Sequence, residues 1–192
     1  MGPFIFGVIL FIVLCIGFSI AGGLLYLTYL PFKKWLIRNG KLTNKRSGQI
    51  NRAYVGLIAL LAFFTTWTAF FPLDSFYKDE FKYNTGLEFP VSGTIIAKAS
   101  EYPDLHGDYW ASAIIEVKED DYQTLKKQIS QRANFSLDTT NQKIGITTEY
   151  DKLTNNINEG EIEVVYSNME KQWFKVAFLK DRKTIIFERN SS

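Results

Sequence analysis

The densest group of side chains that could do chemistry lies in the short segment 101–108. It contains Asp104, His106 and Asp108, and His106 is the only histidine in the chain. Carboxylates and an imidazole are ligands that divalent metals accept. Three ligands at alternate positions of one loop rarely converge without help from elsewhere, so we expect no metal here. A turn in which the aspartate side chains bond to nearby backbone amides is the simpler interpretation.

Aromatic residues flank this polar segment on both sides. Tyr and Trp beside a polar loop are typical of protein interfaces, because their rings bury a large area and keep a polar tip. The sequence therefore predicts that this segment contacts a partner. The candidate partner-binding residues are Tyr102, Asp104, His106, Asp108, Tyr109 and Trp110.

Covalent catalysis would need a nucleophile beside a base and an orienting group. Cys15, the only cysteine, lies in an apolar run, and no serine is close to His106 in sequence. The acids 119–121 lie where a helix is expected to start, and there they complement the helix dipole. We expect no catalytic residue, no enzyme activity and no cofactor. A membrane-proximal hydrolase that uses His106 is an alternative, since three serines could approach in space: Ser92, Ser100 and Ser112.

Two long apolar runs dominate the first third of the chain. Residues 4–32 hold no charged side chain over 29 positions, and residues 53–71 hold none over 19. A membrane-spanning helix needs roughly 20 apolar residues. The two runs therefore predict a transmembrane helical hairpin, in which the longer first helix tilts. The first run has no basic residues before it, so we expect a retained helix and not a cleaved signal peptide.

The segment between the runs, residues 33–52, has seven basic residues and no acidic one. Short loops rich in Lys and Arg stay on the cytoplasmic side of a membrane. We therefore expect an integral cytoplasmic (inner) membrane protein with both termini extracytoplasmic. The basic loop would contact anionic lipid headgroups as a consequence of this topology, without a dedicated ligand. The predicted domains are a hairpin at 1–72 and an extracytoplasmic domain at 73–192.

Charge is divided unevenly along the chain. Residues 1–73 carry seven positive charges and no negative ones, whereas residues 74–192 carry 15 basic and 20 acidic residues, a net charge of −5. The overall charge of +2 is the sum of two opposite parts. The predicted domain is acidic, so the sequence indicates no nucleic-acid partner.

Small residues recur at a spacing of four in the first apolar run. Gly17 and Ala21 form one pair, and Ser19 and Gly23 form another. Small residues at this spacing let two helices approach closely. We favour helix packing inside the hairpin, with homo-oligomer or hetero-oligomer formation through the hairpin as the alternative. Neither run contains an ionisable side chain of the kind that marks ion and proton pathways.

The remaining residues predict a small α+β domain with an antiparallel sheet and two helices that cover one sheet face. Hydrophobic spacing and turn residues indicate its elements. With one cysteine, the domain must be held together by packing and not by a disulfide. The expected helices are 76–84, ended by Gly86, and 120–132; the expected strands are 94–99, 109–117, 143–148, 161–166, 172–179 and 184–188.

These features together predict a membrane-anchored binding module and not an enzyme. We expect the extracytoplasmic domain to recognise a protein partner in the cell envelope, for example as an immunity protein that neutralises a toxin. The alternative is a structural or accessory subunit of a larger membrane complex, with the hairpin as its interface. The lysine-rich, cysteine-poor composition favours a bacterial source.

Overall fold

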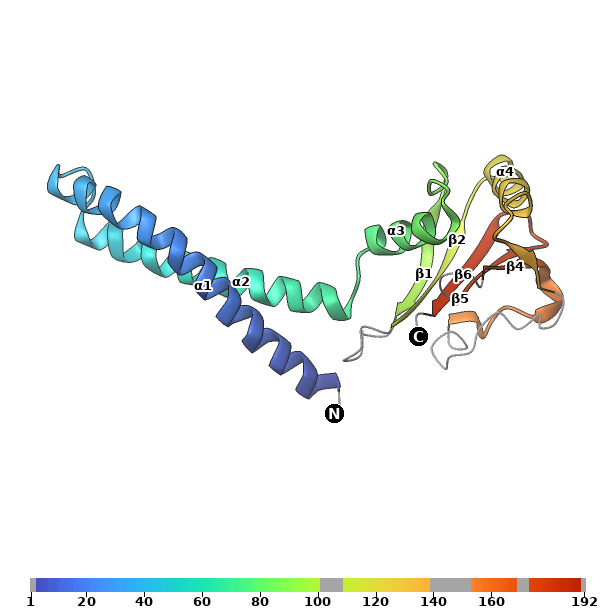
Figure 1. The fold of residues 1–192 in the computed structure, drawn as a ribbon, viewed down its shortest axis with the longest axis horizontal. Coiled ribbons are helices and arrows are strands. Elements are labelled where there is room, and N and C mark those ends of the chain that lie inside the picture. Colours follow the sequence, from blue (N-terminus) through green and yellow to red (C-terminus); the bar gives the residue numbers. More distant parts are fainter. Residues whose placement is uncertain (1–2, 101–108, 139–152, 169–172, 191–192) are drawn as a thin grey trace. The chain divides into compact units, whose positions relative to one another are not determined.

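The structure is a computed structural model of the whole chain, and it describes residues 3–100, 109–138, 153–168 and 173–190. The chain divides into two compact units, Met1–Phe70 and Phe71–Ser192. Figure 1 shows the elements of each unit, which are described separately below.

The first unit is a pair of helices, α1 (Pro3–Arg38) and α2 (Asn44–Phe70). Both are long and apolar enough to cross a membrane. A core helix of a soluble protein would bury most of its apolar residues, but the share buried in the most apolar stretch is 0% in α1 and 6% in α2. By length and composition, both helices are therefore candidate membrane spans.

Within the basic segment 33–52, the sequence predicts that residues 33–39 can continue the first helix and that Gly40 ends it. The helix α1 continues to Arg38 and α2 already starts at Asn44, so only the turn between them is not helical. Lys and Arg side chains lose little rotamer freedom in a helix, so basic residues do not by themselves end one. The turn contains Gly40 with a φ of +66°, and Lys41 donates its backbone N–H to the Leu36 carbonyl at 2.9 Å. This is the glycine-dependent ending that the sequence predicted for the first helix.

The two helices approach closely at Gly22. Tyr54 donates its hydroxyl to the Gly22 carbonyl at 2.6 Å. A Cβ at position 22 would lie 2.5 Å from that hydroxyl, so Tyr54 would have to shift to admit a larger residue. Gly7 is also close to α2, because a Cβ there would lie 3.1 Å from the Phe70 ring. Three threonines of α2, Thr65, Thr66 and Thr68, bond to the backbone of their own helix.

The second unit is one six-stranded antiparallel sheet with the strand order β1-β2-β6-β5-β4-β3. Its strands are β1 (Thr94–Ser100), β2 (Trp110–Glu116), β3 (Ser136–Leu137), β4 (Ile162–Asn168), β5 (Trp173–Leu179) and β6 (Thr184–Asn190). Two helices, α3 (Asp74–Thr85) and α4 (Glu119–Ser130), and a short 3-10 turn, η1 (Glu159–Glu161), complete it. The α+β class is confirmed.

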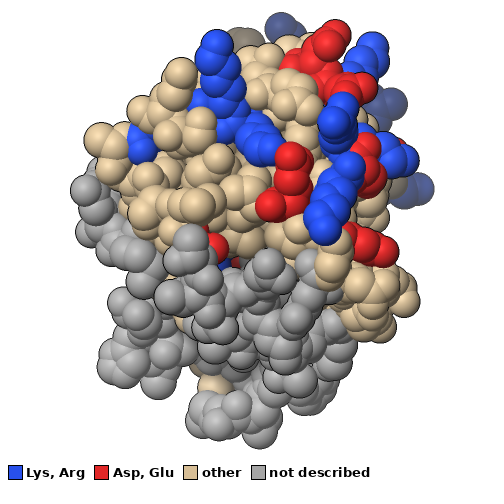
Figure 2. Space-filling view, turned by 90° about the vertical axis from the view of Figure 1, so that its right-hand side faces the viewer, with Lys and Arg blue, Asp and Glu red and all other residues tan. Residues whose placement is uncertain are grey.

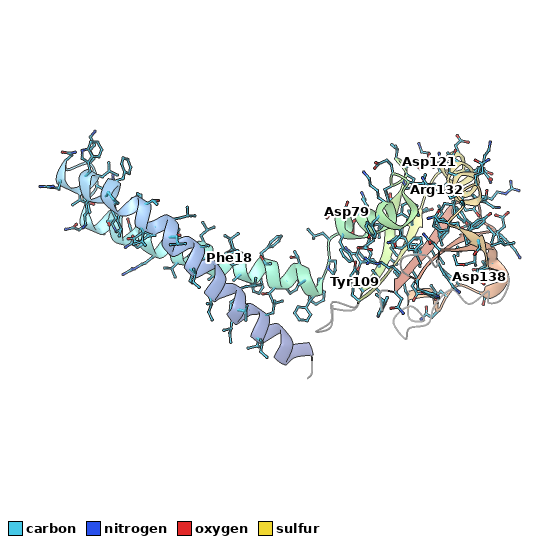
Figure 3. The ribbon with its side chains drawn as sticks, in the orientation of Figure 1. Phe18, Asp79, Tyr109, Asp121, Arg132 and Asp138 are labelled. Atoms are coloured by element: carbon cyan, nitrogen blue, oxygen red, sulfur yellow. The ribbon has the colours of Figure 1, made fainter. Side chains whose placement is uncertain are left out.

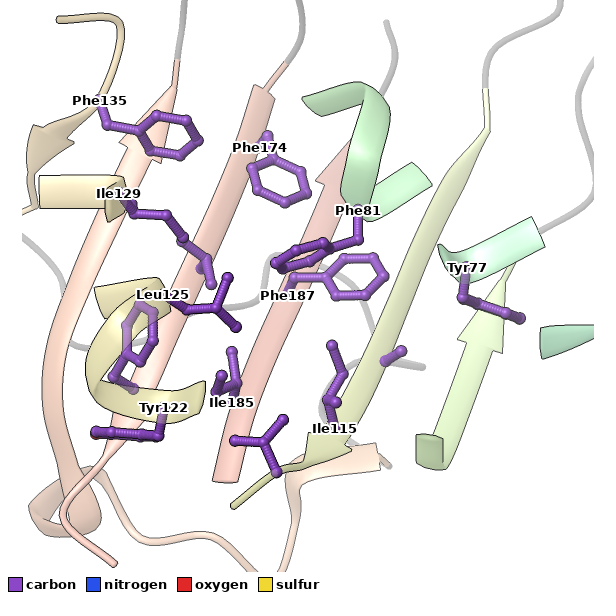
Figure 4. Packing of buried hydrophobic residues seen from close by; sticks show 14 of the residues in the cluster. Tyr77, Phe81, Ile115, Tyr122, Leu125, Ile129, Phe135, Phe174, Ile185 and Phe187 are labelled. Atoms are coloured by element: carbon purple, nitrogen blue, oxygen red, sulfur yellow. The ribbon is translucent and has the colours of Figure 1, made fainter. Parts of the chain in front are cut away.

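Both helices of this unit pack on the same face of the sheet, as predicted. Figure 4 shows Phe81 of α3 against Phe187 of β6, and their ring centroids are 5.8 Å apart. The helix α4 places Leu125 and Ile129 in the same cluster. Burying large apolar side chains contributes roughly 1.5–3 kcal/mol each, which makes this cluster the main source of stability.

Both helix starts differ from the prediction by a residue or two. The residue before α3 is Leu73, with no side-chain capping bond, whereas Asp74 or Ser75 was expected in that position. The end of α3 is as predicted, with Gly86 at a φ of +63°. At the start of α4, Ser92 donates both its hydroxyl and its backbone N–H to Asp121. This contact joins the turn before β1 to the helix.

The last three strands form the predicted meander, β4-β5-β6. The turn between β5 and β6 is tight, because Asp181 accepts the backbone N–H groups of Lys183 and Thr184 at 3.0 and 2.9 Å. The meander does not stay separate from the first two strands, since β6 pairs with β2 along its whole length. The predicted strand at 143–148 lies outside the described residues.

Tyr122→Phe tests the contact between α4 and the sheet. The Tyr122 hydroxyl donates a hydrogen bond to the Leu179 carbonyl at 2.5 Å. The Leu179 carbonyl also accepts the Arg182 backbone N–H, and the Tyr122 hydroxyl also contacts Glu163, so no acceptor is left without a donor. We therefore expect a loss of about 0.5–1.5 kcal/mol in the free energy of unfolding. Urea unfolding of the full chain in detergent, followed by near-UV circular dichroism, measures this. Tyr83→Phe is the control, and its ring is 65% exposed. Equal losses in the two variants would contradict the interpretation.

The Ser92–Asp121 contact predicts a pH dependence of stability. The two hydrogen bonds from Ser92 lower the pKa of the Asp121 carboxyl below its usual 3.8. A carboxyl with a lowered pKa stabilises the fold above its usual pKa and loses that contribution on further acidification. The melting temperature of the native chain should therefore exceed that of Asp121→Asn at pH 6, and the difference should shrink towards pH 3. In a Ser92→Ala background the difference should be smaller at every pH; a constant difference would exclude this role.

Candidate functional site

Several strand ends meet at one end of the sheet. Trp110 starts β2, Trp173 starts β5, and both pair with Asn190, which ends β6. The neighbouring row pairs Ser100, the last residue of β1, with Ala111. The connections between β1 and β2 and between β4 and β5 therefore leave the sheet here. We call it the loop end.

On the helix face of the loop end, Arg189 lies at the centre of a polar cluster. It forms a short ion pair with Glu80 of α3. Tyr109 donates its hydroxyl to the other carboxylate oxygen of Glu80 at 2.6 Å. The guanidinium lies 4.3 Å from the centre of the Tyr109 ring and 5.9 Å from that of Tyr83. We call Glu80, Tyr83, Asn84, Tyr109 and Arg189 the Arg189 cluster.

The Arg189 cluster is largely removed from water. Arg189 and Glu80 have 6% and 9% of their surface exposed. Burial raises the pKa of the Glu80 carboxyl, and the Arg189 charge and the bond from Asn84 only partly oppose this. Each carboxylate oxygen already accepts a hydrogen bond. The pair is thus fixed in position, and it holds the Tyr109 ring against the guanidinium.

Tyr83 is the outward part of the Arg189 cluster. Its side chain is 65% exposed, although its ring lies beside a buried guanidinium. Tyr and Arg held in place in this way are the residue types that contribute most to protein interfaces. The cluster can therefore present a rigid aromatic surface.

The opposite face of the loop end has a row of polar residues. Strand pairing places one residue of each strand in this row, and Ser112, Glu188 and Lys175 occupy its centre. All three are buried. The full row, from β1 to β3, is Ala99, Ser112, Glu188, Lys175, Ser167 and Ser136. We call it the polar row.

Lys175 is the only basic residue of the polar row. Its ammonium lies 2.7 Å from the Asp138 carboxylate, and the two side chains are 9% and 8% exposed. It also lies 4.9 Å from the centre of the Trp173 ring. Ser112 donates to the Phe187 carbonyl at 2.9 Å. Figure 3 labels Tyr109, which directly precedes β2, and Asp138, which directly follows β3.

The predicted partner-binding residues are only partly described. Four of them lie outside the described residues: Tyr102, Asp104, His106 and Asp108. The hydrolase alternative, which depends on His106, therefore stays a prediction. Tyr109 belongs to the Arg189 cluster. Trp110 is the first residue of β2, and with 3% of its surface exposed it is a core residue.

Within the parts of the chain that the structure describes, no group of three or more His, Cys, Asp or Glu side chains is placed to hold a metal ion. Asp104, His106 and Asp108 are outside those parts, so the expectation that they bind no metal stays a prediction.

The small residues predicted to pack helices lie on two different sides of α1. Gly17, Ser19, Ala21 and Gly23 are all exposed, and a Cβ at Gly17 or Gly23 would meet no atom within 4 Å. The glycine in direct contact with α2 is Gly22, whereas Ser19 and Gly23 line a groove between the two helices. The role of the four predicted residues in helix packing stays a prediction.

Sequence reasoning missed the main residues of both polar groups. Glu80 and Arg189 are 109 positions apart, and only the fold brings them together. One signal was present: after the apolar run Ile185–Phe187, the charged residues Glu188 and Arg189 follow inside the same strand. Because strand side chains alternate between faces, one of the two charges had to lie against the helices.

Comparisons of the chain with protein-family models, with curated proteins and with solved structures found no match.

Lys175→Met tests the importance of the polar row for the fold. Removing one member of a buried ion pair is strongly destabilising, so we expect a loss of about 3–5 kcal/mol in the free energy of unfolding. The control is Lys183→Met, which removes an exposed ion pair to Glu116 and should cost about 0–1 kcal/mol. Urea unfolding of the full chain in detergent measures both. Similar losses would show that the Lys175 pair has no special weight.

Proposed function

We propose that this chain is a membrane-anchored, non-enzymatic binding protein whose sheet domain recognises a protein partner on the extracytoplasmic side of a cytoplasmic membrane. The observation that supports this best is the Arg189 cluster. It holds the exposed Tyr83 ring on a rigid base beside the loop end. A preorganised aromatic surface binds without a large cost for ordering side chains.

The charge distribution supports a protein partner more than a nucleic acid. On the face shown in Figure 2, basic and acidic side chains are mixed and do not separate into a basic patch. Residues 74–192 have a net charge of −5. Nucleic-acid binding depends on neutralising many phosphates with Lys and Arg, and a domain of negative charge does not favour this.

The proposed anchor is the pair of apolar helices. Only residues 71–73 separate the end of α2 from the start of α3. Such a short connection gives the sheet domain little reach. A partner would therefore have to be at the membrane surface. The seven basic residues between the apolar runs support a cytoplasmic position for the turn, which assigns the domain to the other side.

An immunity protein that blocks an incoming toxin is a specific form of this proposal. Such a protein needs an anchor, a rigid recognition surface and no chemistry of its own. The exposed Tyr83 ring of the Arg189 cluster provides a recognition element that does not depend on a cofactor.

A second candidate function is that of an accessory subunit of a larger membrane complex. The observation that favours it is the open side of α1, where Gly17 and Ala21 are exposed. In this case the hairpin itself would be the interface.

Site-specific crosslinking tests the binding surface. A photoreactive phenylalanine analogue at Tyr83 should give a crosslinked product of fixed mass in intact cells, because Tyr83 would lie in the interface. The same analogue at Val91, which is fully exposed in the turn before β1, is the matched control. Immunoblots of the purified chain measure the products.

Two outcomes would contradict the proposal. One is an identical pattern of products from positions 83 and 91, which would indicate random collisions. The other is full recovery of the same partner by a chain truncated after Phe71, which would favour the accessory-subunit function instead.

A further inference from the structure

A groove runs along one side of the helix pair, in the same unit as both helices. Its volume is about 360 Å³. Gly23 leaves it open, because a Cβ at this position would meet no atom within 4 Å. Residues of both helices line the groove, among them Ser19, Gly23, Tyr26, Val55 and Ile58.

A lysine lies at the end of the groove that is nearer the turn. Lys33 is half-buried, and its ammonium donates to the Tyr26 hydroxyl at 2.9 Å and to the Asn51 side-chain oxygen at 3.1 Å. Tyr26 in turn donates to Asn51 at 3.0 Å. Tyr26 and Asn51 also line the groove. These contacts fix the position of the lysine relative to the groove.

The charge of Lys33 has no carboxylate to balance it within its own unit. Residues 1–73 contain no Asp or Glu, and both groups that Lys33 contacts are neutral. An ammonium has three N–H donors. Two are used within the described hairpin, so one remains for an anion.

The separation of Gly23 and Lys33 along α1 is comparable to one leaflet of a bilayer. Gly23 and Lys33 are ten residues apart on α1, which is roughly 15 Å at the rise of an α-helix. This is about half of the hydrocarbon thickness of a bilayer. A lipid whose phosphate met Lys33 would have its acyl chain beside Gly23.

We propose that this groove binds one anionic phospholipid, with the phosphate on Lys33 and an acyl chain between α1 and α2 at Gly23. The inference requires the two helices to lie in a membrane, but it does not depend on what the sheet domain recognises. The site differs from general attraction to the basic residues near the turn, because it needs both the fixed cation and the open groove.

Native mass spectrometry of the full chain in detergent, titrated with phosphatidylglycerol, tests the site. We expect one phosphatidylglycerol molecule to bind per chain, at least tenfold more tightly than phosphatidylcholine does. The reason is that the choline group of phosphatidylcholine compensates the phosphate charge. Lys33→Gln should weaken phosphatidylglycerol binding about tenfold, and Lys33→Arg should restore most of it. Lys34→Gln is the matched control. It removes the same charge at the next residue, where the side chain is exposed. We expect less than a twofold effect from it.

Gly23→Leu fills the groove and should also weaken binding about tenfold. Gly17→Leu is its control, because Gly17 is equally open but does not line this groove. Equal losses in Lys33→Gln and Lys34→Gln would overturn the proposal in favour of diffuse attraction. Unchanged affinity in Gly23→Leu would overturn it as well. Loss of a dimer in Gly23→Leu with unchanged lipid affinity would show a helix interface instead. The crosslink at Tyr83 should not change in any of these variants.

Discussion

The sheet domain depends on the pairing of its last strand with one of its first. β6 lies between β2 and β5, and it pairs with β2 over seven residues and with β5 over six. Without it, β1 and β2 would be a hairpin with no connection to the other three strands. Isolated two-stranded hairpins are marginally stable at best in water. The fold is therefore complete only when the last described residues of the chain have been placed.

The position of β6 also determines both polar groups at the loop end. Adjacent residues of a strand point to opposite faces, so Glu188 joins the polar row and Arg189 joins the cluster under α3. Both side chains are buried. Buried ion pairs often contribute less stability than apolar residues of the same volume. The apolar clusters provide the stability, and the charges fix which groups lie beside one another at the loop end.

The sequence predicts features that depend on neighbouring residues and misses those that depend on distant ones. The helices α1 and α2 follow from long runs without charge, and Gly86 ends α3 because of a local backbone conformation. The insertion of β6 beside β2 has no local signal. Tyr109 could be named as a candidate partner-binding residue because its aromatic and polar neighbours are adjacent in sequence. Glu80 and Arg189 could not be named, because only the fold brings them together. In the basic segment 33–52, the end of the first helix near Gly40 also follows from a local signal, whereas the start of α2 at Asn44 was not predicted.

Small residues on a helix have two different uses in this chain, and their surroundings separate them. Gly22 lies against Tyr54, whose hydroxyl would have to move if position 22 had a Cβ, so glycine favours the close approach of the two helices. Gly23 is the next residue and has open space beside it, next to a groove. Sequence spacing cannot distinguish these two positions, because the pattern of small residues does not tell which side of α1 faces α2. The placement of α2 decides it, through the bond from Tyr54 to the Gly22 carbonyl and the contact of Lys33 with Asn51. The same contacts that close the hairpin therefore border the groove and fix the cation beside it.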